Sequence, residues 1–156
     1  MIPIKPNGSI NIQGASKKYK VEFLNMTHST IQSSCVAVHT PDGVILYAND
    51  YKLDNTPIMG EKPNYKRLKQ LSKEGIKALV VDCLYAPDDR KTPSEKIARG
   101  LLEDVFFTTD NRNQGMIVST FSSHIARIKS IVEFGKKLGR ETIVLGTFEC
   151  GFLTFI

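Results

Sequence analysis

The sequence predicts an α/β fold, and three observations support this prediction. In the first third of the chain, short runs that alternate polar and apolar residues indicate β-strands. In the middle, apolar residues three or four positions apart indicate two amphipathic helices. In the last third, an apolar run, an amphipathic helix and a second apolar run follow one another. This order is typical of a β-α-β unit in a sheet that helices cover.

The strands expected first are short apolar runs around a tight turn. Residues 20–24 alternate in polarity, as a half-buried strand does. Residues 35–39 and 44–47 form two more such runs, separated by Pro41-Asp42-Gly43. Because proline, aspartate and glycine adopt turn dihedrals readily, these two runs are predicted to form a hairpin, with His39 on its surface.

The first helix is expected at residues 65–73. Leu68 and Leu71 are spaced by three positions, so they share one face of a helix. Gly75 follows this stretch and is placed to end the helix, because glycine adopts the left-handed conformation that helix C-termini often need.

The second helix is expected to begin within Thr92-Pro93-Ser94-Glu95. Thr92 is the predicted N-cap, and Pro93 suits the first helical position because that position needs no N–H donor. Glu95 is then placed to complete a capping box. The predicted buried stripe of this helix consists of Ile97, Leu101, Leu102, Val105 and Phe106.

The last part of the chain changes in character. Residues 115–121 form an apolar strand, and residues 142–146 form another after an amphipathic helix that Gly139 ends. The helix face expected to be buried consists of Ile125, Ile128, Ile131 or Val132, and Leu138. Because this β-α-β pattern differs from the hairpin that precedes it, a domain change is expected near 111–115. The expected domains are 1–110 and 111–156.

Composition narrows the class of protein. The chain has 156 residues, with 41% hydrophobic and 24% charged residues, which suits one or two small globular units. Its net charge of +5 is a mild bias toward anionic partners. The odd number of cysteines, Cys35, Cys83 and Cys150, favours reduced structural thiols and a cytoplasmic location. No apolar run approaches the roughly 20 residues that span a bilayer, so no membrane partner is expected.

Three polar residues follow the ends of apolar runs. His28 comes after the first predicted strand, Asp50 after the hairpin, and Asp82 after the apolar run 78–81. Imidazole and carboxylate groups are zinc ligands, so these residues are candidates for a metal site. Each also has a plainer interpretation, as a polar residue at a strand end, a turn acid or a cap. Asp54 has no such context and is expected to be solvated.

Five motifs in this chain resemble, in their order and spacing, those of the ribonuclease J family, in particular of its archaeal branch. The motifs are Met26-Thr27-His28-Ser29-Thr30-Ile31-Gln32, Tyr47-Ala48-Asn49-Asp50-Tyr51-Lys52-Leu53-Asp54, Val80-Val81-Asp82, Lys91-Thr92-Pro93-Ser94-Glu95 and Ser119-Thr120-Phe121-Ser122-Ser123-His124-Ile125. The family belongs to the β-CASP group of nucleases with the metallo-β-lactamase fold. The resemblance runs from about Val21 to about Gly146 and corresponds to the middle of a family member.

The resemblance implies a fold and a chemistry. The first domain becomes the second part of a metallo-β-lactamase αββα fold, and the second becomes the start of a β-CASP β-α-β domain. The resemblance implies that His28 is a ligand of one zinc ion. It also implies that Asp50 is the catalytic carboxylate that bridges two zinc ions. Asp82 matches the first acid characteristic of the β-CASP group, a catalytic residue beside the metals. Two bridged metal ions activate a shared water for phosphodiester hydrolysis.

The resemblance also implies RNA as the partner, with 5′-to-3′ exoribonuclease activity and some endonuclease activity. A homo-oligomer is a further expectation, although the sequence does not indicate which oligomer forms. Ser122, Ser123 and His124 are the expected RNA contacts, because free amides at a helix N-terminus bind phosphate. The plainer interpretation is that they only cap the helix. Two features depart from the family pattern. The chain has no His-x-His-x-Asp-His cluster, as expected of an internal fragment, and its apolar end at 146–156 suggests a truncated or frame-disrupted reading frame.

A second hypothesis therefore stands beside the zinc-dependent ribonuclease. The chain lacks several of the metal ligands that the family site needs, so it is alternatively a non-catalytic remnant. Such a remnant acts at most as an RNA-binding or subunit-interaction module. A thioester hydrolase or β-lactamase of the same superfamily is a more distant alternative, because those enzymes lack the unit at 116–145.

Overall fold

The computed structural model describes residues 2–147 and 150–155, and side chains as far as residue 145. The chain divides into two compact units. The first comprises the residues up to 28, 32–55 and 60–92, and the second comprises 29–31, 56–59 and the chain from residue 93 onward. The domain boundary expected near 111–115 stays a prediction.

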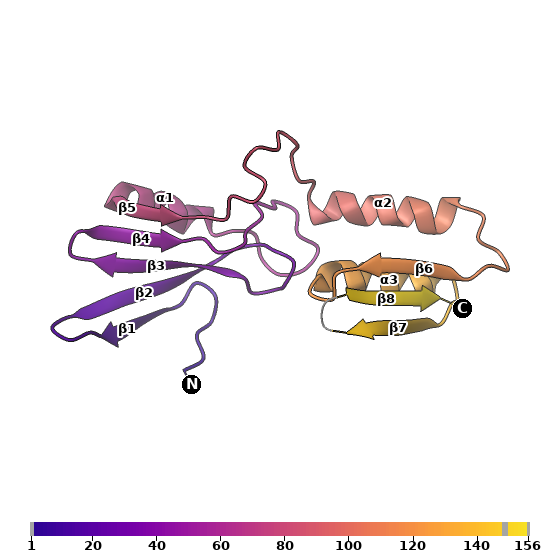
Figure 1. Ribbon diagram of the computed structural model, residues 1–156, viewed down its shortest axis with the longest axis horizontal. Coiled ribbons are helices and arrows are strands. Elements are labelled where there is room, and N and C mark those ends of the chain that lie inside the picture. Colours follow the sequence, from indigo (N-terminus) through magenta and orange to yellow (C-terminus); the bar gives the residue numbers. More distant parts are fainter. Residues whose placement is uncertain (1, 148–149, 156) are drawn as a thin grey trace. The chain divides into compact units, whose positions relative to one another are not determined.

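The first unit contains a five-stranded sheet and one helix (Figure 1). Its elements are β1 (Ser9–Gln13), β2 (Lys18–Asn25), β3 (Ser34–Thr40), β4 (Gly43–Tyr47), α1 (Tyr65–Glu74) and β5 (Ile76–Val80). The strands lie in the order β1-β2-β3-β4-β5. All neighbours are antiparallel except β4 and β5, which are parallel. The α/β class is thus confirmed, with a mixed sheet.

The predicted hairpin is confirmed as β3 and β4. Thr40 pairs with Gly43, so Pro41 and Asp42 form the turn. Gly43 has a φ of +127°, a conformation that residues with a side chain rarely adopt. The expectation for His39 was wrong, because this residue is partly buried and its Nε2 lies 3.0 Å from a carboxylate oxygen of Glu22.

The core of the first unit lies between α1 and one face of the sheet. Leu71 of α1 is fully buried and packs in one cluster with Leu24 and Ala37 of the sheet, while Leu68 lies at the margin of this cluster. The predicted helix is confirmed, and the N–H of Gly75 donates a hydrogen bond to the Leu71 carbonyl at 3.2 Å. The apolar face of the helix and the alternation of the strands therefore meet as the sequence predicts.

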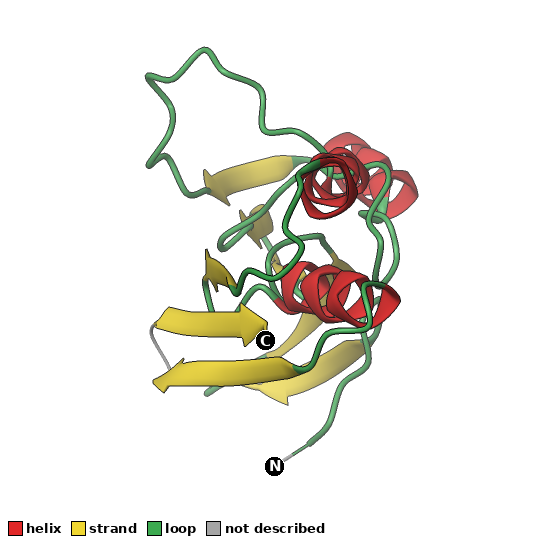
Figure 2. Cartoon of the chain, turned by 90° about the vertical axis from the view of Figure 1, so that its right-hand side faces the viewer, coloured by secondary structure: helices red, strands yellow, loops and turns green. Residues whose placement is uncertain are grey.

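The second unit contains two helices and a three-stranded sheet. Its elements are α2 (Glu95–Thr108), β6 (Met116–Thr120), α3 (Ile125–Lys137), β7 (Thr142–Thr147) and β8 (Cys150–Phe155). Figure 2 draws these helices in red and the strands in yellow. The strand order is β6-β8-β7, and β8 is antiparallel to both neighbours. β6 and β7 are therefore parallel to one another, but β8 separates them.

The insertion of β8 differs from the simplest form of a β-α-β unit. The sequence predicted the two strands and the helix between them, and all three are present. The apolar end of the chain was not predicted as a strand, yet it pairs along β7 from Thr142 to Thr147. Strands that are consecutive in sequence commonly pair, and β8 occupies the position beside β7 that β6 was expected to fill.

The start and the buried stripe of α2 need correction. Ser94, not Thr92, is the N-cap, and its hydroxyl accepts a hydrogen bond from the Ile97 N–H at 3.3 Å. Phe106 is buried, with Leu102 packed against its cluster. Three of the residues predicted to be buried are more than half exposed: Ile97, Leu101 and Val105. α2 packs against α3 through Phe106 and Leu102, and the three exposed residues do not belong to this cluster.

The buried face of α3 centres on an aromatic residue that the sequence pattern did not identify. Phe134 is fully buried, and its ring centroid lies 5.7 Å from that of Phe106. Ile131 is buried as predicted, whereas Ile125 is 40% exposed. Gly139 ends the helix as expected, with a φ of +69°.

Candidate functional site

The polar residues His28, Asp50 and Asp82 follow three strands that run in the same direction. β2 is antiparallel to β3, β3 is antiparallel to β4, and β4 is parallel to β5. The directions of β3, β4 and β5 can be followed in Figure 1. The carboxyl ends of β2, β4 and β5 therefore lie at one edge of the sheet. We call this edge the polar edge.

A backbone bridge joins the segments that carry His28 and Asp50. Thr27 and Lys52 form an isolated antiparallel pair, and the Lys52 N–H donates to the Thr27 carbonyl at 2.7 Å. The Thr27 hydroxyl donates in turn to the Lys52 carbonyl. Since His28 directly follows Thr27 and Asp50 lies shortly before Lys52, this bridge holds the two candidate ligands on neighbouring segments.

The segment of Asp50 turns sharply after β4. Asn49 has a positive φ of 54°, a left-handed conformation that asparagine tolerates better than most residues. Immediately before it, the Ala48 N–H donates to the Val80 carbonyl at 2.8 Å. This bond joins the segment of Asp50 to the end of β5, from which the chain leads to Asp82.

Asp82 begins a tight turn after β5. Its Oδ1 accepts a hydrogen bond from the Leu84 N–H at 2.9 Å. This contact agrees with the plainer interpretation of Asp82 as a turn-forming acid, and it also fixes the orientation of the carboxylate. His28, Asp50 and Asp82 are all exposed.

The donor groups at the polar edge suit a metal ion only in part. Imidazole and carboxylate are appropriate zinc ligands, but a catalytic zinc ion needs three protein ligands. Within residues 2–147 and 150–155, no group of three histidine, cysteine, aspartate or glutamate side chains lies close enough together to hold a metal ion. The described residues therefore show no complete metal site.

Asp54 stands close to this edge and is not solvated as expected. It is 3% exposed, and its Oδ2 lies 3.6 Å from the Lys52 ammonium group. The Asp54 N–H also donates to the Thr27 hydroxyl at 3.1 Å. The buried Thr27 and Asp54 and the partly buried Lys52 thus form a small support beside the segments of His28 and Asp50. The sequence signal for this support was the motif itself, in which Asp54 is the last residue.

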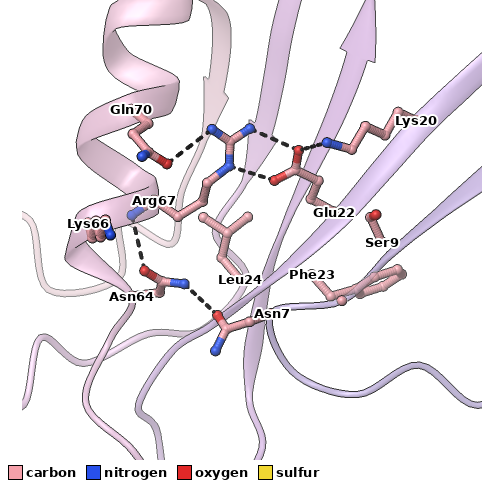
Figure 3. Close-up of a pocket in the computed structure, with 11 residues that line it drawn as sticks. Asn7, Ser9, Lys20, Glu22, Phe23, Leu24, Asn64, Lys66, Arg67 and Gln70 are labelled. Carbon is pink, nitrogen blue, oxygen red and sulfur yellow. Dashed lines mark hydrogen bonds and ion pairs between the residues drawn. The ribbon is translucent and has the colours of Figure 1, made fainter.

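A separate groove lies between α1 and the β1–β2 ribbon (Figure 3). Its volume is about 380 Å³, and Glu22 and Arg67 line it together with Lys20. Arg67 donates to both carboxylate oxygens of Glu22, at 2.7 and 2.8 Å. The Arg67 guanidinium and the neighbouring Lys20 lower the pKa of Glu22 to about 2. Glu22, Arg67 and Lys20 are thus paired with one another, and this pairing joins α1 to β2.

The segment Ser122–His124, which we call the RNA-contact segment after its predicted role, precedes α3. His124 is the N-cap residue of α3, but its side chain makes no capping hydrogen bond. The plainer interpretation, that this segment caps the helix, agrees with the position of His124 as the N-cap residue. Its backbone N–H donates instead to the Phe121 carbonyl at 3.0 Å, which closes a turn.

A buried carboxylate that the sequence did not single out for the site lies against this segment. Glu95 is 4% exposed and pairs with Arg127 of α3, with Nε–Oε1 and Nη2–Oε2 distances of 2.8 and 3.1 Å. Its Oε2 also lies 3.7 Å from Nε2 of His124. The sequence predicted Glu95 as a capping residue, and only the fold brings it to α3.

The cysteines and helices bear on the class of protein. Cys35 is a buried free thiol, and burial raises its pKa. Cys83 is free and exposed. The side chain of Cys150 lies outside the described residues.

In the part of the chain that the structure describes, no helix is long and apolar enough to cross a membrane.

Comparison with known proteins gives no match to a family model. Individual relatives do match. Ribonuclease J of Pyrococcus abyssi is 47% identical over 131 residues, which are 84% of this chain and 29% of that protein. Ribonuclease J of Methanocaldococcus jannaschii is 44% identical over 126 residues, or 81% of this chain and 28% of that protein. Ribonuclease J of Synechocystis sp. is 35% identical over 130 residues, or 83% and 20%.

The chain thus spans less than a third of the length of these curated relatives. The matches nevertheless cover most of the chain itself. Over this matched region, the chain is a homologue of ribonuclease J.

Proposed function

We propose that this chain is part of a metal-dependent ribonuclease of the ribonuclease J type, which hydrolyses RNA from its 5′ end and also cleaves internally. His28 and Asp50 supply ligands to a site for two zinc ions, and Asp50 and Asp82 take part in catalysis. The domain assignment follows the same resemblance, with a partial metallo-β-lactamase domain at 1–110 and the start of a β-CASP domain at 111–156.

The polar edge is the observation that carries this proposal. Three strands of one direction bring His28, Asp50 and Asp82 to the same edge of a sheet. Polar groups that chemistry requires are commonly placed on loops at strand ends, where a rigid sheet positions them without burying them. The identity of 47% with a ribonuclease J over this region supports the same roles.

RNA is the proposed partner. The RNA-contact segment precedes α3, and amides at a helix N-terminus are suited to phosphate. The net charge of +5 favours a polyanion. Free thiols at Cys35 and Cys83 support a reducing compartment, which we propose to be the cytoplasm. We also propose a homo-oligomer.

One observation favours a second candidate function. The described residues contain no group of three potential metal ligands. In this second candidate, the chain is a non-catalytic module that at most binds RNA or another subunit. The two candidate functions differ in whether the polar edge supports RNA hydrolysis when the remaining metal ligands are supplied.

A hybrid protein tests the proposal. The 131 matched residues of the Pyrococcus abyssi ribonuclease J are replaced by the corresponding residues of this chain. We expect the hybrid to release nucleotides from a 5′-labelled RNA, and the hybrid with Asp50→Ala to lose this activity by several orders of magnitude while still binding RNA.

The matched control for Asp50→Ala is Asp42→Ala, which changes an exposed aspartate in the β3–β4 turn. A folded hybrid without activity would favour the non-catalytic module. Near-normal cleavage by the Asp50 variant would remove Asp50 from the site.

A further inference from the structure

We propose that Glu95 is a positioning residue for the RNA-contact segment. This inference rests on the proposed function, because it concerns how Ser122–His124 is held for RNA. The carboxylate of Glu95 lies on α2, whereas the segment it holds lies at the start of α3. Glu95 itself acts through Arg127 and His124 and does not touch the reacting atoms.

The geometry joins one carboxylate to two side chains of the first turn of α3. Arg127 makes a bidentate pair with Glu95, at 2.8 and 3.1 Å. Such a pair fixes direction as well as distance, because the planar guanidinium and the planar carboxylate must lie in register. The Oε2 atom that accepts from Arg127 also faces Nε2 of His124 at 3.7 Å. Two points of contact thereby fix the start of α3.

The electrostatics of the helix ends explain why a carboxylate is needed here. A helix N-terminus carries partial positive charge, which disfavours cationic side chains such as Arg127. α3 has no acidic residue in its first turn that could compensate. Glu95 supplies the missing negative charge from the first turn of α2, where a carboxylate is itself favourable. At 4% exposure, this interaction is weakly screened by solvent.

The next turn of α2 shows that Arg99 is held by a different carboxylate. Arg99 lies 2.7 Å from the Glu133 carboxylate and donates to the Ser130 hydroxyl at 3.0 Å. Glu133 is thus a second acidic residue on the same helix pair, and its pair with Arg99 lies one turn or more away from His124. Glu133→Gln is therefore a matched control for Glu95→Gln, since each removes one negative charge between α2 and α3.

The first experiment measures the contact without RNA. The chain contains three histidines, so the imidazole signals can be assigned in an NMR spectrum with single histidine variants. We expect Glu95→Gln to shift the His124 ring signal and leave the His28 and His39 signals unchanged. Glu133→Gln should leave the His124 signal in place. If Glu95→Gln and Glu133→Gln have the same effect on the His124 signal, the inference is overturned. Ion pairs that only stabilise the packing of α2 on α3 would not distinguish Glu95 from Glu133.

The second experiment measures binding of a fluorescent single-stranded RNA by anisotropy. We expect His124→Ala and Glu95→Gln each to raise Kd at least fivefold, and Glu133→Gln to change it less than twofold. If Glu95 acts through the segment, the double variant Glu95→Gln, His124→Ala should bind about as weakly as the weaker single variant. If the fold-changes in Kd of the two single variants multiply in the double variant, the two residues act independently and the inference is overturned.

The outcomes separate this inference from its premise. If Ser123→Ala and His124→Ala leave Kd unchanged, the proposed RNA contact itself is wrong. If they weaken binding while Glu95→Gln does not, only the role of Glu95 is wrong. Should Glu95→Gln not fold, Arg127→Gln removes the partner through which Glu95 acts. A folded Arg127→Gln variant with unchanged Kd and an unchanged His124 signal would equally overturn the inference.

Discussion

Arg67 and Glu22 form a bidentate ion pair that joins α1 to β2, with Nε–Oε2 and Nη2–Oε1 distances of 2.7 and 2.8 Å. Arg67 also pairs with Glu74 on its own helix. His39 of β3 lies within 3.0 Å of the same Glu22 carboxylate. The pair therefore fastens the helix to two strands of the sheet on which the polar edge depends.

Acid should weaken the first unit through this pair. The pKa of Glu22 falls from its ordinary 4.5 to about 2 in the folded protein. A lowered carboxylate pKa means that the stabilisation is complete above about pH 4.5 and is lost as the pH falls toward 2. We expect Glu22→Gln to remove about 2–3 kcal/mol of this pH-dependent stability.

Urea unfolding at several acidic pH values checks this prediction. The control is Glu61→Gln, which changes an exposed carboxylate of the same unit. A wild-type unfolding free energy with the same acid dependence as the Glu22 variant would contradict it.

The bridge beneath the polar edge should matter for both stability and metal binding. Thr27→Val keeps the shape of the side chain but removes its hydrogen bonds to Lys52 and Asp54. We expect a loss of about 1–3 kcal/mol in the unfolding free energy, since buried partners are left unsatisfied. Zinc binding should also weaken, although no ligand is changed.

Thr40→Val is the matched control for this change. The Thr40 hydroxyl makes a similar bond to the Gly43 carbonyl, at 2.6 Å, in the turn that joins β3 to β4. Equal weakening of zinc binding by both variants would show that the bridge has no special relation to the polar edge.

Zinc should bind to the chain weakly. His28 and Asp50 are two proposed ligands, whereas a catalytic zinc ion needs three protein ligands. Calorimetric titration should give one weak site that His28→Ala and Asp50→Ala each abolish. Asp42→Ala should leave it unchanged. Two tight sites in the wild-type chain would contradict the incomplete ligand set.

The core of the second unit should depend strongly on Phe134. Phe134 is fully buried, and Arg99 stacks 4.6 Å from its ring centroid. We expect Phe134→Ala to cost about 3–5 kcal/mol, as for other large core residues. Phe121→Ala is the control, because Phe121 is 70% exposed. Thermal unfolding followed by circular dichroism measures both, and a similar effect of the two changes would contradict the assigned core.

The chain should self-associate through the sheet face opposite α1. One row of paired apolar residues crosses this face through Phe23, Val36, Tyr47 and Val80. Tyr47 and Val80 are 47% and 48% exposed. Apolar patches of this kind favour association. Sedimentation velocity should show oligomers whose fraction rises with concentration and falls in Tyr47→Asp. A monomer at high concentration would contradict this.

Short-range residue patterns in the sequence predicted most of the secondary structure. Alternation predicted β2, β3 and β4, and the turn residues Pro41 and Asp42 predicted their hairpin. Gly75 and Gly139 marked two helix ends because a left-handed residue there is a local requirement. The motifs around His28 and Asp50 likewise indicated the ribonuclease J homology, since each motif is short and contiguous.

Only the tertiary structure decided which distant groups meet. Glu95 and Arg127 are separated by 32 positions and Glu22 and Arg67 by 45, so no periodic pattern links them. The burial of Asp54, the exposure of Ile97 and the position of β8 between β6 and β7 were equally invisible to local patterns. Periodicity reports which face of an element is apolar, whereas burial and ion pairing depend on the neighbour that the fold places against that face.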